Sequence, residues 1–126
     1  MVDVAKQIEY WRTSSDEDFA AAQSLLEKEH LRHSLFFAHL AIEKILKAHV
    51  TKQTKDISPR IHNLVRLAKL AQLNLNPDQL EFLREFNLYQ LEGRYHDDKP
   101  VPIDTGLTRK EILRAEKMLI WLKTRL

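Results

Sequence analysis

Charged side chains within apolar segments are the first candidates for chemistry in this chain. Glu43 and Lys47 stand one helical turn apart, in the i,i+4 order in which a carboxylate and an ammonium group pair. Asp18 lies on the apolar stripe of an earlier segment. Burying a carboxylate is costly unless it is paired or hydrogen-bonded. We therefore expect either a buried polar network containing Lys47 or Arg94, or a pocket between helices where Asp18, Glu43 and Arg94 bind a small ligand.

A second group of reactive side chains is the run from Arg94 to Asp97. Arg94 could hold a phosphate in a bidentate fork, Tyr95 could stack on a base, and Asp97 could bond a ribose or a cation. A structural alternative is that Arg94 bonds carbonyl groups or a carboxylate and that Tyr95 anchors the following loop. The predicted ligand-binding residues are therefore Asp18, Glu43, Lys47, Arg94, Tyr95 and Asp97.

Metal and cofactor chemistry is not indicated. The chain has no cysteine, which excludes thiolate metal sites and disulfides. A di-metal carboxylate bundle needs Glu-x-x-His on two helices and two further glutamates, and only Glu27 to His30 fits that spacing. We expect no metal site and no required cofactor, and we treat a nucleotide as the candidate ligand.

These side chains must be positioned by helices. The chain has only 2 Gly and 4 Pro, too few for the many tight turns of a small β fold. Apolar residues recur with helical spacing in five segments, and their expected ranges are 3–29, 32–52, 59–73, 77–92 and 108–126. We predict one all-α domain over residues 1–126. It would be an up-down antiparallel helical bundle of about five helices.

Local signals indicate where the helices begin and end. Ser58-Pro59 is typical of a helix start, and Asn76 with Gln79 predicts a capping box. Thr108 with Glu111 predicts another capping box, opening the last helix. The run 14–18 is rich in capping residues, so a break in the first helix could occur there.

The net charge is only +2, but acidic and basic blocks alternate along the chain. Residues 1–43 and 77–98 are acidic, and residues 44–73 and 108–126 are basic. Helices of opposite sign could pack together, or a basic face could bind RNA phosphates or an acidic partner. No apolar run is long enough to cross a membrane, and no signal peptide is visible. We expect a cytoplasmic protein with no membrane partner.

Four motifs resemble the HEPN family. Trp11 with Asp18-Phe19, Ala22 and Leu25-Leu26 is similar to the pattern of its first helix. The run 38–48, Ala-His-Leu-Ala-Ile-Glu-Lys-Ile-Leu-Lys-Ala, resembles its Ala-Gln-Gln-Ala-Ala-Glu-Lys-x-Leu-Lys-Ala. The runs 61–64 and 93–97 resemble Thr-His-x-Leu and Ala-Arg-Tyr-Pro-Asp. His39 and Leu40 replace both glutamines of the second motif, and His96 replaces the proline of the last.

The resemblance implies a helical bundle that often dimerises. Members are often encoded beside a minimal nucleotidyltransferase, some act in toxin–antitoxin pairs, and some are ribonucleases with a late Arg-x(4–6)-His motif. Arg94 would be that arginine, but no histidine stands at 99–101, and His96 is too near. Arg32 to His39 has the spacing but lies in the second helix. The sequence therefore argues against an enzyme of the usual kind.

Three functions follow from these observations. The first is a module that binds a nucleotide or acts with a nucleotidyltransferase, in a toxin–antitoxin or stress-response pair. The second is a ribonuclease acting on RNA with a non-standard catalytic set, Arg94 and His96. The third is a structural homodimer that scaffolds another protein. A homodimer is expected in each case.

Overall fold

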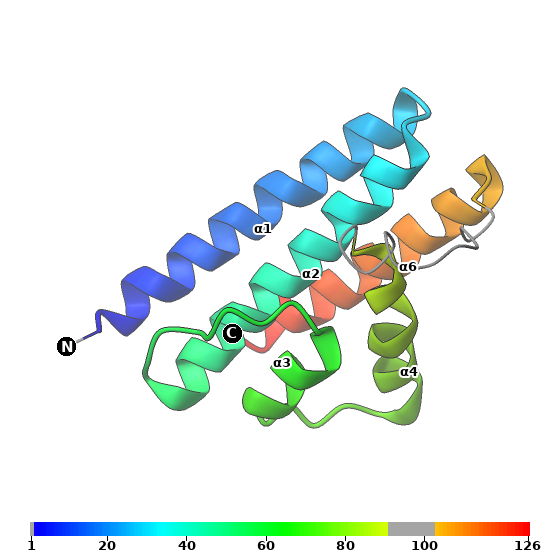
Figure 1. Ribbon diagram of the computed structural model, residues 1–126. Helices are drawn as coiled ribbons and strands as arrows, with labels where there is room; N and C mark the ends of the chain where they lie inside the picture. Colours follow the sequence, from blue (N-terminus) through cyan, green and yellow to red (C-terminus); the bar gives the residue numbers. More distant parts are fainter. Residues whose placement is uncertain (1, 91–102) are drawn as a thin grey trace.

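The structure is a computed structural model that describes residues 2–90 and 103–126, and these residues contain helices and no strand (Figure 1). Its elements, in chain order, are α1 (Val4–Glu27), α2 (Leu31–Thr54), α3 (Leu64–Leu70), α4 (Pro77–Phe86), the 3-10 helix η1 (Asn87–Tyr89) and α6 (Thr105–Thr124). The predicted all-α bundle is confirmed, and the described residues contain five α-helices and one 3-10 helix. Residues 91–102, which include Arg94, Tyr95, His96 and Asp97, lie outside the described residues.

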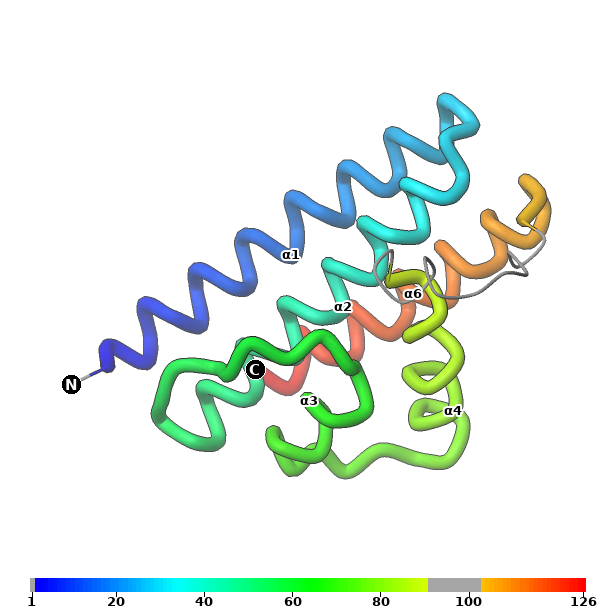
Figure 2. Tube along the Cα trace, viewed as in Figure 1, coloured from blue at the N-terminus to red at the C-terminus, as the bar shows by residue number. Residues whose placement is uncertain are grey.

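The first two helices form a long antiparallel hairpin (Figures 1 and 2). The break considered at residues 14–18 is wrong, because α1 is continuous from Val4 to Glu27. Ser15 is fully buried, and its hydroxyl donates to the carbonyl oxygen of Ala41 at 2.7 Å. Ser34 on α2 donates to the carbonyl oxygen of Ala22, also at 2.7 Å. These serines join the two helices at close range instead of capping new ones.

α2 is the central element, with α1 and α6 against it and α3 on a further side (Figure 2). α6 runs parallel to α2: His49 Nε2 lies 2.8 Å from the carbonyl oxygen of Leu122, and Lys52 donates to that of Arg125 at 2.9 Å. One hydrophobic cluster includes side chains from every helix that the structure describes. Its largest fully buried members include Leu35, Ile42, Ile45, Leu46, Leu64, Leu67, Leu83, Phe86, Leu119 and Leu122.

The third helix is shorter than the sequence predicts. It begins at Leu64, not Pro59, and Asn63 caps it by accepting from the backbone N–H of Arg66. The Ser58-Pro59 start signal is wrong because residues 57–63 precede the helix and bring His62 against Glu43 on α2. Residues that local propensity would place in a helix thus stay outside it, and a tertiary contact holds them instead.

Two further helix boundaries were predicted with mixed success. The capping box of Asn76 and Gln79 is confirmed at the start of α4, which ends at Phe86 and continues as η1. The capping box of Thr108 is wrong, because α6 begins at Thr105 with Asp104 as its N-cap. Thr108 is buried one turn later, where its hydroxyl donates to the carbonyl oxygen of Asp104 at 2.8 Å. Within the described residues no helix could span a membrane.

Candidate functional site

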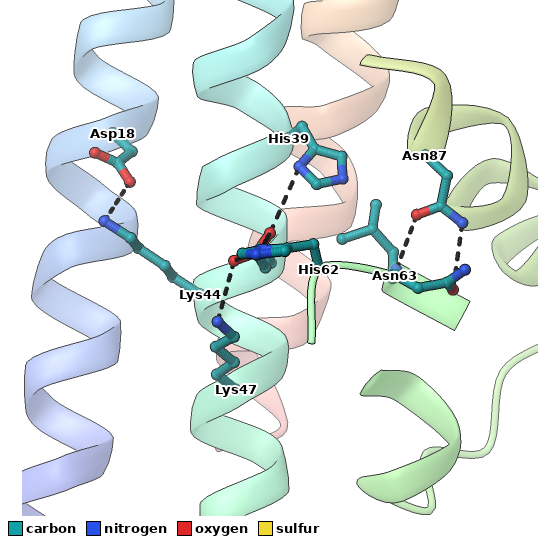
Figure 3. Close-up of polar contacts among 9 residues, drawn as sticks. Asp18, His39, Lys44, Lys47, His62, Asn63 and Asn87 are labelled. Atoms are coloured by element: carbon teal, nitrogen blue, oxygen red, sulfur yellow. Dashed lines mark hydrogen bonds and ion pairs between the residues drawn. The ribbon is translucent and has the colours of Figure 1, made fainter. Parts of the chain in front are cut away.

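A buried carboxylate on α2 is the centre of a polar cluster, and Figure 3 labels its neighbours His39, Lys47 and His62. Glu43 is only 3% exposed, and its Oε2 lies 3.1 Å from Nζ of Lys47. Nδ1 of His62 lies 3.1 and 3.2 Å from the two carboxylate oxygens of Glu43. Lys47 also lies 5.2 Å from the ring centroid of Trp11 on α1, a cation–π distance. We call Trp11, His39, Glu43, Lys47 and His62 the α2 cluster.

The loop before α3 brings His62 to this cluster. His62 is 19 residues from Glu43 in the chain, and its side chain is half exposed. Asn63 caps α3 directly after it. Asn87 holds the start of α3, because its Oδ1 accepts from the backbone N–H of Leu64 at 2.8 Å and its amide lies 3.4 Å from Oδ1 of Asn63 (Figure 3). The imidazole is therefore placed by two asparagines that fix the backbone beside it.

His39 carries unsatisfied polar atoms inside the cluster. It is fully buried, and its Nδ1 lies 3.8 Å from Oε1 of Glu43, beyond hydrogen-bond range. Within the described residues neither ring nitrogen has a hydrogen-bond partner, and neither has the buried indole Nε1 of Trp11. Burial, followed by the charge of His62, lowers the pKa of His39 to about 4. His39 is therefore neutral at physiological pH and contributes no charge to the cluster.

Asp18 forms a separate ion pair with the neighbouring lysine. Its Oδ2 lies 2.7 Å from Nζ of Lys44, which also donates to the hydroxyl of Ser14 at 2.7 Å. Consecutive residues of a helix point about 100° apart, so Lys44 turns toward Asp18 on α1 (Figure 3), while Glu43 contacts His62. Asp18 and Glu43 therefore have different cationic partners, and each pair is electrically compensated.

The predicted site residues are thus partly located. The buried network of Glu43 with Lys47 is present as an ion pair, and Asp18 pairs beside it on α1. Whether Arg94 joins either carboxylate stays a prediction, and so do the roles of Tyr95, His96 and Asp97, which lie outside the described residues. The Arg32 to His39 spacing does not make an RNA-cleaving pair here, because His39 has no surface that RNA could reach.

Sequence reasoning missed the participation of Trp11, His39 and His62 in one cluster. His62 had a signal, since Ile61-His62-Asn63-Leu64 resembles a family motif, yet its spacing from Glu43 has no helical meaning. Trp11 stands in the first-helix motif, but its contact with Lys47 depends on the register of the α1–α2 hairpin. Within the described part of the chain no three His, Asp or Glu side chains are arranged to hold a metal ion.

A second buried carboxylate lies on α6 and is fully bonded. Glu111 Oε1 accepts from Arg114 at 2.8 Å, and Oε2 accepts from the hydroxyl of Tyr89 at 3.2 Å. Arg114 also lies 3.5 Å from Glu85 and over the ring of Phe82. Burial and the charge of Glu111 raise the pKa of Tyr89 to about 12. We call these residues the α6 cluster.

The fold and these two clusters define a small all-helical bundle with polar groups buried around its central helix. The family model of the HEPN domain matches residues 8–125, so the chain belongs to the HEPN family. The fold is similar to that of TT1696 from Thermus thermophilus, with a TM-score of 0.79 and 20% identity, covering 95% of this chain and 98% of that one.

A second solved structure has the same fold. It is ST0689, an archaeal HEPN homologue, with a TM-score of 0.75 and 19% identity, covering 94% of this chain and 96% of that one. At such identities the likeness concerns the fold. No curated protein sequence matches the chain significantly.

Proposed function

We propose that this HEPN chain is a binding module for a nucleotide and acts with a nucleotidyltransferase partner, without catalysing a reaction itself. The observation that supports this proposal best is the α2 cluster. It combines a buried carboxylate, a paired ammonium group, a half-exposed imidazole and buried ring nitrogens without partners among the described residues.

An incompletely bonded cluster is expensive as a purely structural device. A buried donor or acceptor without a partner costs about 1–3 kcal/mol. Replacing such groups by apolar side chains would avoid this cost, so their presence beside an ion pair supports a functional role for the cluster. His39 and Trp11 both carry such atoms next to the Glu43 and Lys47 pair. Polar groups gathered between helices in this way are typical of a ligand site.

The α2 cluster would be the rigid part of the site in this proposal. Trp11 offers an aromatic face beside Lys47, and His62 offers its exposed edge. From the sequence, Arg94 would hold a phosphate, Tyr95 would stack on the base and Asp97 would bond the ribose or a cation. The ion pair of Asp18 with Lys44 would hold α1 against α2 beside this site.

The family supports a protein partner. HEPN domains often dimerise, and we propose a homodimer that pairs with a minimal nucleotidyltransferase in a toxin–antitoxin or stress-response system. The exposed basic side chains of α6, which include Arg109, Lys110 and Lys117, offer a face for an acidic partner or for RNA.

A thermal-shift screen tests nucleotide binding. The purified chain is heated with and without ATP, GTP, CTP and UTP. A nucleotide present at one hundred times its Kd stabilises the native state by about 2.7 kcal/mol. This corresponds to a rise in Tm of roughly 10 °C for a domain of this size. The proposal fails if no nucleotide raises the Tm and no nucleotidyltransferase co-purifies with the chain.

A matched pair of variants locates the binding site. His62→Ala removes a half-exposed side chain of the α2 cluster, and His33→Ala removes an exposed histidine from the start of α2. We expect both variants to fold, and only His62→Ala to reduce the nucleotide-induced shift. An equal shift in both variants would place the nucleotide away from the α2 cluster.

A further inference from the structure

The charges around the α2 cluster are already compensated. Glu43 pairs with Lys47, and Asp18 pairs with Lys44. No cation of these two pairs is left over for a phosphate, and two carboxylates would repel it. Whatever part of a ligand lies here must therefore be neutral, and it must bond to the half-exposed side chain of His62, because the ring nitrogens of His39 are buried.

The hydrogen-bonding character of the exposed edge of His62 follows from its contact with Glu43. An ionised carboxylate can only accept hydrogen bonds, so the Nδ1 atom that faces both oxygens of Glu43 must carry a proton. In a neutral imidazole the other nitrogen, Nε2, then carries a lone pair. The half-exposed side chain of His62 thus presents an acceptor to a ligand, above a buried carboxylate that holds this tautomer in place.

We infer that the α2 cluster recognises a ribose hydroxyl group of the nucleotide, and that Nε2 of His62 accepts the hydrogen bond from this hydroxyl. This inference rests on the proposed nucleotide binding and specifies the ligand class as a ribonucleotide over a deoxyribonucleotide. The hydroxyl is neutral, as the compensated charges require, and it is a donor, as the His62 tautomer requires. The indole of Trp11 lies on the α1 side of the cluster, where it contacts Lys47, the partner of Glu43.

Isothermal titration with sugar analogues tests the inference on the intact chain. ATP, 2′-deoxy-ATP and 3′-deoxy-ATP are titrated at pH 8, where an ordinary imidazole is neutral. If the screen finds another base preferred, the matching analogues of that base are used. We expect the affinity to fall about tenfold for at least one deoxy analogue, the effect of one lost neutral hydrogen bond. All three nucleotides keep the same base, so a base amino group cannot account for the difference.

Variants separate this hydrogen bond from a general loss of binding. His62→Phe keeps a flat ring and removes both nitrogens, and it should bind ATP and the deoxy analogues with equal, reduced affinity. His33→Phe, at an exposed position of α2, should keep the preference of the parent chain. Equal binding of all three nucleotides by the parent chain would overturn the inference and leave the proposed function standing. Failure of every nucleotide to bind would remove the proposed nucleotide binding, and the inference with it.

Nitrogen-15 NMR of the histidine rings tests the tautomer without a substitution. We expect the folded chain at pH 8 to show His62 protonated on Nδ1 and unprotonated on Nε2. Hydrogen on Nε2 and a lone pair on Nδ1 would overturn the inference whatever the nucleotide affinities, because the exposed atom would then be a donor.

Discussion

Glu43 on α2 and Glu111 on α6 are both buried carboxylates on helices of the same core, yet their surroundings differ. Around Glu111 each oxygen accepts a hydrogen bond, and Arg114 is shared with Glu85 and the ring of Phe82. Around Glu43 the ion pair with Lys47 lies beside buried ring nitrogens that have no partner among the described residues.

The two clusters differ in whether their buried polar groups are fully hydrogen-bonded. A fully bonded network such as the α6 cluster stabilises the fold by satisfying what it buries. The α2 cluster leaves buried ring nitrogens of His39 and Trp11 without partners among the described residues, which is a cost to stability. Under our proposal the α6 cluster has a structural role and the α2 cluster is the ligand site.

Removing the two glutamates should give the largest difference between the clusters. In Glu43→Ala, Lys47 stays buried without a counter-ion, and we expect the free energy of unfolding to fall by about 3–5 kcal/mol. Urea unfolding followed by circular dichroism measures this change. The double variant Glu43→Leu with Lys47→Met removes both charges and should recover most of the loss. A loss below that of Glu111→Ala would contradict the assigned burial of the pair.

Acid should weaken the α2 cluster through His39. Its pKa is about 4 in the folded chain and near 6.5 in the unfolded chain, so between these values the unfolded chain binds the extra proton. Stability is therefore lost as the pH falls from about 6.5 to about 4, by on the order of 2–3 kcal/mol for this one group. Urea unfolding at a series of pH values should show a smaller acid loss in His39→Leu than in the parent chain. His33→Leu serves as the control and should retain the parent slope.

The α6 cluster should respond more weakly to loss of its carboxylate. In Glu111→Ala, Arg114 keeps Glu85 and about a third of its side chain is exposed, so we expect a loss of about 1–2 kcal/mol. The same variant should lower the pKa of Tyr89 from about 12, because one of its causes is removed.

An alkaline titration follows this tyrosine directly. The folded pKa of Tyr89 is raised, so its contribution to stability is complete below pH 10 and is lost as the pH rises from about 10 to about 12. Ultraviolet absorbance should show a late-ionising tyrosine that is absent in Tyr89→Phe. An unchanged late ionisation in Glu111→Ala would show that burial alone sets this pKa.

An exposed ion pair should give the smallest effect and calibrates the others. Arg84 and Glu81 pair on the surface of α4, and both side chains are more than half exposed. We expect Arg84→Ala to change the free energy of unfolding by no more than about 0.5 kcal/mol. If Arg84→Ala loses as much free energy of unfolding as Glu111→Ala, then the losses in the buried clusters come from charge pairing and not from burial.

Local spacing was enough to predict several features of this protein. The scarcity of Gly and Pro and the helical period of apolar residues predicted an all-α bundle. The Glu43 and Lys47 pair and the capping box of Asn76 and Gln79 were also predicted correctly. Each of these features joins residues three or four apart, and the geometry of a helix turn fixes such distances wherever the helix lies.

Only the tertiary structure decided which distant residues meet. His62 faces Glu43 across 19 residues, Trp11 lies beside Lys47, and Ser15 binds α2 where its type suggested a cap. The start of α3 at Leu64 depends in the same way on Asn87. Such partners are chosen by how helices pack and in which register. A run of residue types leaves several registers open, and burying one common core selects among them.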